Sequence, residues 1–106
     1  MIVEERVYTL RPGATARYLE IWHERGRSAQ IRHLGIPLGV YTCDVGELNT
    51  ITFLWRFDSP TERVVRRDAL LADTEFAAFR AAVRELMVSQ RNRLLTPVSL
   101  PRADPA

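Results

Sequence analysis

Alternating apolar and polar positions predict three strands in the first half of the chain. They span Ile2–Leu10, Leu38–Cys43 and Thr50–Phe57. In the third strand every second residue from Ile51 to Phe57 is apolar, and the opposite face still carries Leu54. Both faces are therefore partly apolar. We expect one face to pack on helices and the other on a second sheet or a second subunit.

A helical period follows the first strand, over residues Ala14 to His33. Gly26 lies within its apolar stripe, where a missing side chain is expected to allow close approach of the helix backbone to the sheet. Leu34-Gly35 supplies the stop signal. The expected buried stripe consists of Tyr18, Leu19, Trp22, Gly26, Ala29 and His33.

Two helix starts are recognisable in the second half of the chain. Ser59 with Pro60 and Glu62 forms an N-cap and capping box, and this helix should run to about Leu71. Asp73 caps the next helix, which has an apolar stripe at Phe76, Phe79, Val83 and Leu86.

The end of the chain is less clearly patterned. Residues 87–96 alternate as an edge strand would, although a helical continuation remains an alternative. Residues 97–106 contain three prolines and are expected to form an irregular tail. The chain should thus be one domain, residues 1–96, followed by a tail. The overall order predicts an α+β fold.

Composition excludes several classes of chemistry. All fifteen basic residues are arginine, so enzymes that need a lysine amine are excluded: Schiff-base enzymes, pyridoxal-phosphate enzymes and P-loop nucleotidases. Cys43 is alone, which excludes an intrachain disulfide. A net charge of +2 gives no support to nucleic acid as a partner. No apolar run is long enough to span a membrane, and nothing resembles a targeting signal, so we expect a cytoplasmic protein.

Several segments, taken in order, resemble the NIPSNAP family of the dimeric α/β-barrel superfamily. One departure is Thr74, where relatives often have proline after the aspartate. The match extends over nearly all of residues 2–96. It is carried by Arg6–Gly13, Arg32–Gly35, Val45–Asn49, Leu54–Ser59, Arg63, Arg66-Arg67 and Ala69–Asp73.

The resemblance implies a ferredoxin-like β-α-β-β-α-(α)-β subunit and a homodimer formed through the sheet. It does not imply one activity, because family members share no settled reaction. The wider superfamily includes cofactor-independent monooxygenases, isomerases, cyclases and haem-handling enzymes. That is an analogy between folds, which says little about function.

Three residues are candidates for acid–base catalysis in a cleft between the sheet and the first helix. His33 can exchange a proton near neutral pH. Tyr8 and Tyr41 could orient a polar ligand through their hydroxyls. The alternative for His33 is a structural histidine at the edge of the core, bonded to a helix end or a backbone carbonyl.

Further residues are candidates for substrate binding, although each also has a structural explanation. His23 follows Glu20 at a metal-ligand spacing, but with a single copy we expect no metal site and no cofactor. Arg6 is expected to pair with Glu4. Arg63, Arg66 and Arg67 resemble a phosphate patch, but a solvated helix face is favoured. The predicted binding residues are Tyr18, Trp22, His23, Asn49, Trp55 and Arg56.

These observations favour a cofactor-free enzyme or accessory catalyst that acts on a small carbonyl or phenolic metabolite by acid–base chemistry. Two alternatives stay open: a small-molecule-binding protein without catalysis, and a homodimer whose function is protein interaction.

Overall fold

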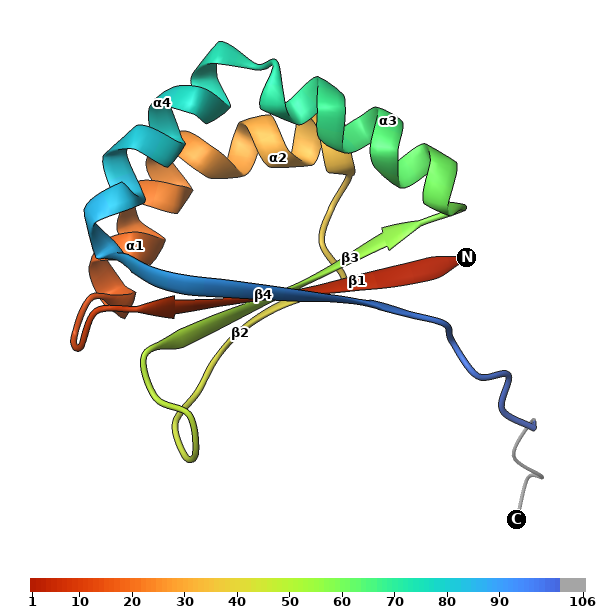
Figure 1. Ribbon diagram of the computed structural model, residues 1–106, viewed down its shortest axis with the longest axis horizontal. Coiled ribbons are helices and arrows are strands. Elements are labelled where there is room, and N and C mark those ends of the chain that lie inside the picture. Colours follow the sequence, from red (N-terminus) through yellow and green to blue (C-terminus); the bar gives the residue numbers. More distant parts are fainter. Residues whose placement is uncertain (102–106) are drawn as a thin grey trace.

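The protein has two layers, with all helices on one face of a four-stranded sheet (Figure 1). The computed structural model describes residues 1–101. Every pair of neighbouring strands is antiparallel, in the order β2-β3-β1-β4. The elements are β1 Ile2–Leu10, α1 Thr15–Ile21, the π-helix η1 Trp22–Gly26, α2 Arg27–Leu34, β2 Gly39–Thr42, β3 Thr50–Phe57, α3 Pro60–Leu71, α4 Thr74–Val83, the 3₁₀-helix η2 Arg84–Leu86 and β4 Met87–Leu95.

The predicted order of elements and the α+β class are confirmed. β1 and β3 have the predicted bounds, and β2 is one residue shorter at each end than the predicted Leu38–Cys43. The C-terminal segment is the edge strand β4, not a continuation of the helix. Residues 96–101 have no helix or strand, and the rest of the expected tail, 102–106, lies outside the described residues.

The predicted helix over Ala14–His33 contains an unpredicted wide turn. Its middle, η1, is π-helical, which places one more residue in the turn than an α-helix has. Positions after this turn are therefore displaced along the buried face. Gln30 and Leu34 are 4% and 2% exposed, whereas His33 lies at the margin. The expectation of a buried stripe ending at His33 was wrong for this reason.

Gly26 does permit a close approach, but the neighbour is a helix and not the sheet. A Cβ atom at this position would lie 2.7 Å from the ring of Phe79 on α4. Such a distance is shorter than any normal van der Waals contact. The absence of a side chain at Gly26 thus lets η1 and α4 pack directly against each other.

Aromatic side chains fill the space between the sheet and the helices. Phe53 on β3 is fully buried, and it contacts Tyr8 of β1 and Trp22 of η1 edge-on. Trp55 stacks beside Phe53 with ring centroids 6.0 Å apart. These contacts fix β1 and the first helical segment relative to one another.

Both predicted helix starts are present. Ser59 accepts a hydrogen bond from the backbone N–H of Glu62, and Asp73 accepts from the backbone of Glu75 and Phe76. These caps satisfy amide groups that have no partner inside a helix.

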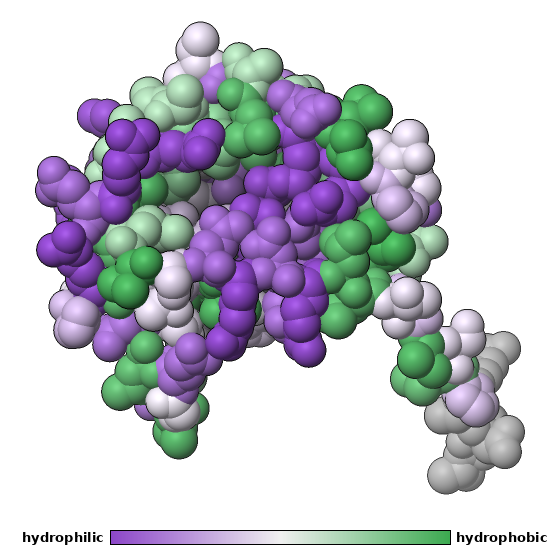
Figure 2. Space-filling view, viewed as in Figure 1, coloured by the Kyte–Doolittle hydropathy of each residue, from purple (hydrophilic) through white to green (hydrophobic). Residues whose placement is uncertain are grey.

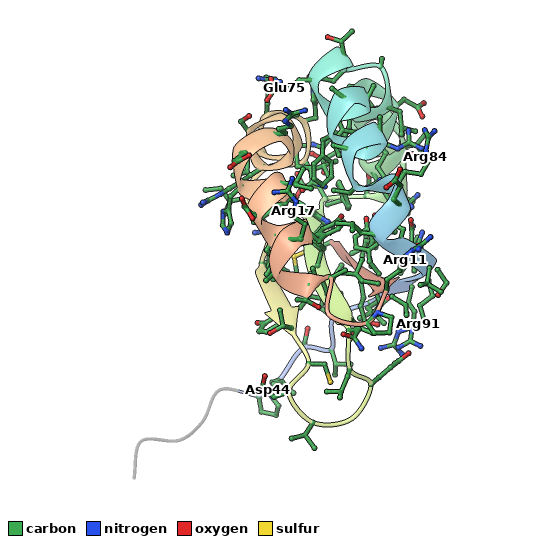
Figure 3. The ribbon with its side chains drawn as sticks, turned by 90° about the vertical axis from the view of Figure 1, so that its left-hand side faces the viewer. Arg11, Arg17, Asp44, Glu75, Arg84 and Arg91 are labelled. Atoms are coloured by element: carbon green, nitrogen blue, oxygen red, sulfur yellow. The ribbon has the colours of Figure 1, made fainter. Side chains whose placement is uncertain are left out.

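Among residues 1–101, no helix packs on the second face of the sheet (Figure 1). The loop between β2 and β3, which includes Asp44, projects on the side away from the helices (Figure 3). In residues 1–101 we find no helix whose length and hydropathy would suit a lipid bilayer.

Candidate functional site

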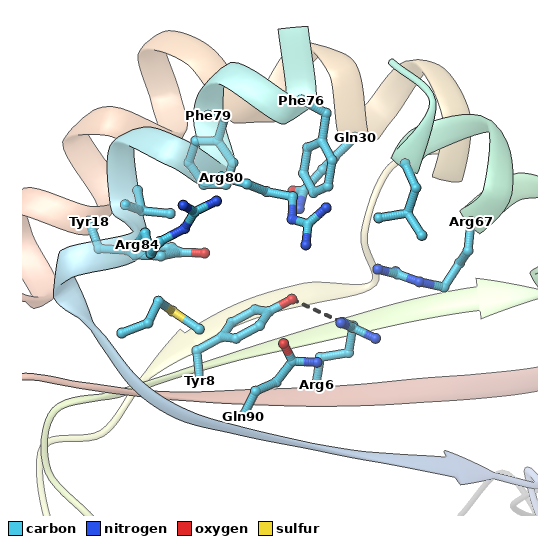
Figure 4. Close-up of a pocket in the computed structure, with 13 residues that line it drawn as sticks. Arg6, Tyr8, Tyr18, Gln30, Arg67, Phe76, Phe79, Arg80, Arg84 and Gln90 are labelled. Atoms are coloured by element: carbon cyan, nitrogen blue, oxygen red, sulfur yellow. Dashed lines mark hydrogen bonds between the residues drawn. The ribbon is translucent and has the colours of Figure 1, made fainter. Parts of the chain in front are cut away.

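A cavity of about 250 Å³ lies between the sheet and the helices, opening beside β4. Strands β1 and β4 form its floor, and α3 and α4 contribute most of its roof (Figure 4). Hydrophilic side chains gather over this part of the surface (Figure 2). The lining comprises Arg6, Tyr8, Tyr18, Gln30, Arg67, Leu71, Phe76, Phe79, Arg80, Val83, Arg84, Met87 and Gln90.

A buried carboxylate that does not itself line the cavity lies behind the end formed by Arg6 and Arg67, the deep end. Glu4 is 0% exposed, and its Oε2 accepts hydrogen bonds from Arg6 at 3.1 Å and from Arg63 at 2.6 Å. Burial alone would raise the pKa of Glu4, but the hydrogen bond from Arg63 and the charges of Arg6 and Arg67 outweigh it and lower that pKa. Glu4 is therefore ionised and surrounded by guanidinium groups.

Arg67 contributes a second cation to this end. Its guanidinium lies 3.7 Å from Glu4 Oε1, too far for a hydrogen bond, so its N–H groups are available to the cavity. Burial and the nearby charge of Arg6 lower the pKa of Arg67, yet an arginine keeps its charge at any physiological pH.

The expectation that Arg63, Arg66 and Arg67 form a solvated helix face was wrong for two of them. The side chains of Arg63 and Arg67 are only 23% and 14% exposed, because both reach across to Glu4. Arg66 is more exposed and pairs with Glu62, one turn earlier in α3, at 2.7 Å. The expected pair of Arg6 with Glu4 is likewise present, at 3.1 Å.

Two phenols face the cavity from different elements. Arg6 Nε donates a hydrogen bond of 2.9 Å to the hydroxyl of Tyr8, so the O–H of Tyr8 remains free to donate into the cavity (Figure 4). Burial and the neighbouring Tyr8 raise the pKa of Tyr18 well above its ordinary value, against an opposing effect of Arg6. Tyr18 therefore remains a protonated hydrogen-bond donor.

Gln30 presents its amide nitrogen to the cavity because its oxygen is already engaged. The indole N–H of Trp22 donates to Gln30 Oε1 at 2.6 Å. An indole nitrogen can only donate, so this bond fixes which end of the amide faces Trp22. The amide N–H₂ group, without a hydrogen bond to any described residue, is left for the cavity.

Arg80 on α4 and Arg84 on η2 lie one helical turn apart at the mouth. Both point into the cavity in Figure 4. Neither forms an ion pair within residues 1–101. Like charges at this spacing repel each other, which an anion between them would relieve.

The predicted acid–base residues do not lie together. Tyr8 lines the cavity. His33 lies outside it and shares a 2.7 Å hydrogen bond with Asp73, the N-cap of α4. Tyr41 is 56% exposed on the helix-free face of the sheet, over Gly39. The catalytic roles of His33 and Tyr41 stay predictions.

The predicted binding residues are also dispersed. Tyr18 lines the cavity, and Trp22 supports it through Gln30. His23 is exposed and lies in a separate shallow depression with Arg27 and Arg32. Asn49 lies in a turn with a φ of 60°, and its side chain accepts a hydrogen bond from the backbone N–H of Gly13. Trp55 is a core residue, and Arg56 is exposed.

Several lining residues were missed by the sequence analysis. Arg80 and Arg84 flank the apolar stripe of α4, and their spacing of four was the available clue. Gln30 had none, because its burial depends on the wide turn of η1. No group of three or more metal-ligating side chains was found among the described residues.

Comparisons with known proteins give a consistent result. The NIPSNAP family model matches residues 3–101. The human protein NipSnap homolog 3B is 34% identical over 103 residues, which are 92% of this chain and 40% of that protein. The chain thus spans less than half the length of this curated relative.

Solved structures agree in fold. A NIPSNAP family protein with unknown function from Agrobacterium tumefaciens is 32% identical, with a TM-score of 0.91 over 95% of this chain and 91% of that chain. An antibiotic biosynthesis monooxygenase has a TM-score of 0.65 at 14% identity, over 93% of this chain and all of that chain, which shows a shared ferredoxin-like fold alone. On the family model and these relatives, the chain belongs to the NIPSNAP family.

Proposed function

We propose that the protein binds a small organic acid in this cavity and that Tyr8 is the acid–base group that acts on it. The observation that carries the proposal is the balance of charge: four guanidinium groups border one cavity, and no carboxylate is among the described residues that line it. Guanidinium groups bind carboxylates and other oxyanions in a fixed fork geometry. The apolar walls, including Phe76 and Phe79, suit a carbon skeleton.

Tyr8 has the geometry of a proton donor. Its hydroxyl oxygen already accepts from Arg6, so its own proton can pass to an oxygen of the ligand on which negative charge develops. The O–H bond of Tyr8 breaks, a ligand O–H bond forms, and the phenolate left behind is stabilised by the adjacent Arg6 cation. This step needs no cofactor, and it suits carbonyl and phenolic compounds.

The first test uses para-nitrophenolate, whose absorbance reports its ionisation. We expect wild-type protein to bind the phenolate and Tyr8→Phe to bind it at least about tenfold more weakly, since a hydrogen bond to a charged group contributes about 1.5–3 kcal/mol. Tyr41→Phe makes the same chemical change outside the cavity, and His33→Gln tests the alternative catalytic residue. Weaker binding by either of these variants, with Tyr8→Phe unaffected, would refute the role of Tyr8.

We also propose that a second copy of the chain covers the helix-free face of the sheet. The cross-strand register places Val3, Val7, Leu54 and Leu95 on this face, beside the exposed Tyr41. Apolar residues on the open face of a thin sheet favour a partner surface. A second copy is the occupant that the family resemblance also implies.

Sedimentation equilibrium tests this proposal. Wild-type protein should sediment at twice the chain mass of 12.2 kDa. Leu54→Glu, which puts a carboxylate opposite Glu5, should sediment as a single chain, whereas Val65→Glu on the exposed side of α3 should not change the mass. A folded wild-type single chain at micromolar concentration would contradict the proposal.

A further inference from the structure

The charges around the cavity are not evenly neutralised. At the deep end, Arg6 shares Glu4 with Arg63, and Arg67 lies nearby. At the mouth, Arg80 and Arg84 have no acidic partner within residues 1–101. One carboxylate on a ligand could satisfy the deep end, but it would leave the mouth with two repelling cations.

The two groups of cations occupy different parts of the cavity. Arg67 on α3 and Arg6 on β1 lie toward one end, Arg84 lies near Tyr18 at the other, and Arg80 reaches into the space between them (Figure 4). The first pair comes from α3 and β1, and the second pair comes from α4 and η2. A ligand that contacts both groups must therefore carry two separated anionic groups.

The uncharged polar groups between these ends are hydrogen-bond donors. Gln30 offers its amide N–H₂ because Trp22 occupies its oxygen, and Tyr8 and Tyr18 offer hydroxyl protons. Donors in this arrangement suit a ligand that is rich in acceptor oxygens. The volume of about 250 Å³ lies below the roughly 300–1,000 Å³ of sites for drug-sized ligands, which favours a small metabolite.

We propose that the ligand is a small organic dianion, with one carboxylate held by Arg6 and Arg67 and a second acidic group held by Arg80 and Arg84. This inference rests on the proposed function and specifies its ligand class. The second group is an oxyanion, either a carboxylate or a phosphate, because a guanidinium fork binds both.

The test measures displacement of bound para-nitrophenolate by a matched series of acids. The series comprises benzoate, isophthalate, terephthalate and para-phosphonobenzoate. At least one dianion should displace the probe at about tenfold lower concentration than benzoate, because one additional charge-assisted hydrogen bond contributes about 1.5–3 kcal/mol. The relative potency of the dicarboxylates and the phosphonate identifies the second group.

The variant that removes the second contact is Arg80→Gln with Arg84→Gln. The ratio of dianion affinity to benzoate affinity, about tenfold in wild type, should fall to about one in this variant, whatever the change in the affinity for benzoate itself. Arg17→Gln with Arg25→Gln removes the same charge from the exposed surface of α1 and η1 and should keep the preference. Because all four side chains are exposed, both double variants should fold, which thermal melting monitors.

Each outcome has a distinct meaning. Equal displacement by benzoate and the dianions in the wild-type protein overturns the dianion inference, as does a preference that survives in the Arg80→Gln, Arg84→Gln variant. Both results leave the proposed binding of a monoanion intact. Failure of wild-type protein to bind para-nitrophenolate or any acid of the series overturns the proposed function itself.

Discussion

Replacement of Glu4 by glutamine is expected to lower the free energy of unfolding by about 3–5 kcal/mol, the usual result of removing one partner from a buried ion pair. Glu4 is fully buried and hydrogen-bonded to both Arg6 and Arg63. A neutral amide would leave these guanidinium groups, and the nearby Arg67, without a counter-charge. Urea denaturation measures the loss, which is large beside the total of about 5–15 kcal/mol for a domain.

The control for this change is Glu20→Gln on the exposed surface of α1. Glu20 pairs with Arg17 at 3.2 Å and both side chains are more than half exposed, so its loss should cost no more than about 1 kcal/mol. Similar losses for the two variants would show that the buried cluster around Glu4 has no special role in stability.

The difference in stability between wild type and Glu4→Gln is expected to depend on pH. Because the pKa of Glu4 is lowered in the folded state, its contribution is fully present above the ordinary carboxyl value of 4.5 and is lost as the pH falls through the lower folded value. The stability difference between the two proteins should therefore shrink in acid.

Replacement of Phe53 by alanine is expected to cost about 3–5 kcal/mol of unfolding free energy, the range for a fully buried phenylalanine. Phe53 contacts Tyr8, Trp22 and Trp55. Two of these support the cavity, so the affinity for para-nitrophenolate should fall together with stability. Denaturant unfolding and probe binding on one preparation measure both effects.

Two further variants calibrate that result. Phe53→Leu retains most of the apolar volume and should cost less than the alanine variant. Val65→Ala, at a position that is 64% exposed, should change the stability by no more than about 0.5 kcal/mol. A loss below about 1 kcal/mol for Phe53→Ala would contradict the central packing role of this ring.

The fold was largely predictable because its signals are local. Alternation defined β1 and β3, and the caps at Ser59 and Asp73 located the starts of α3 and α4. The edge strand β4 was correctly favoured over a helix from alternation alone. Each of these inferences needed no more than ten consecutive residues.

The cavity was harder to predict because it depends on the register of the first helix. A single wide turn at η1 moves Gln30 and Leu34 onto the buried face, where an α-helical period had placed His33. No particular residue type predicts such a π-helical turn. Of the nine predicted site residues, Tyr8 and Tyr18 line the cavity, and both precede the turn.

Long-range ion pairs were the second obstacle. Glu4 and Arg63 are 59 positions apart, and their contact follows only from the packing of α3 on the sheet. Viewed as a local helix pattern, Arg63 and Arg67 resembled solvated residues. The available clue was Glu4, which faces the helices from a central strand, because a buried carboxylate requires cationic partners.

Among the residues of the structure that line the cavity, arginine is the sole source of positive charge. A guanidinium group does not deprotonate in a protein, unlike a histidine or a buried lysine. The positive charge of the cavity lining is thus constant across the physiological pH range. A change of ligand occupancy with pH would therefore report protonation of the ligand. The pH profile of binding would in this way indicate which acidic groups the ligand carries.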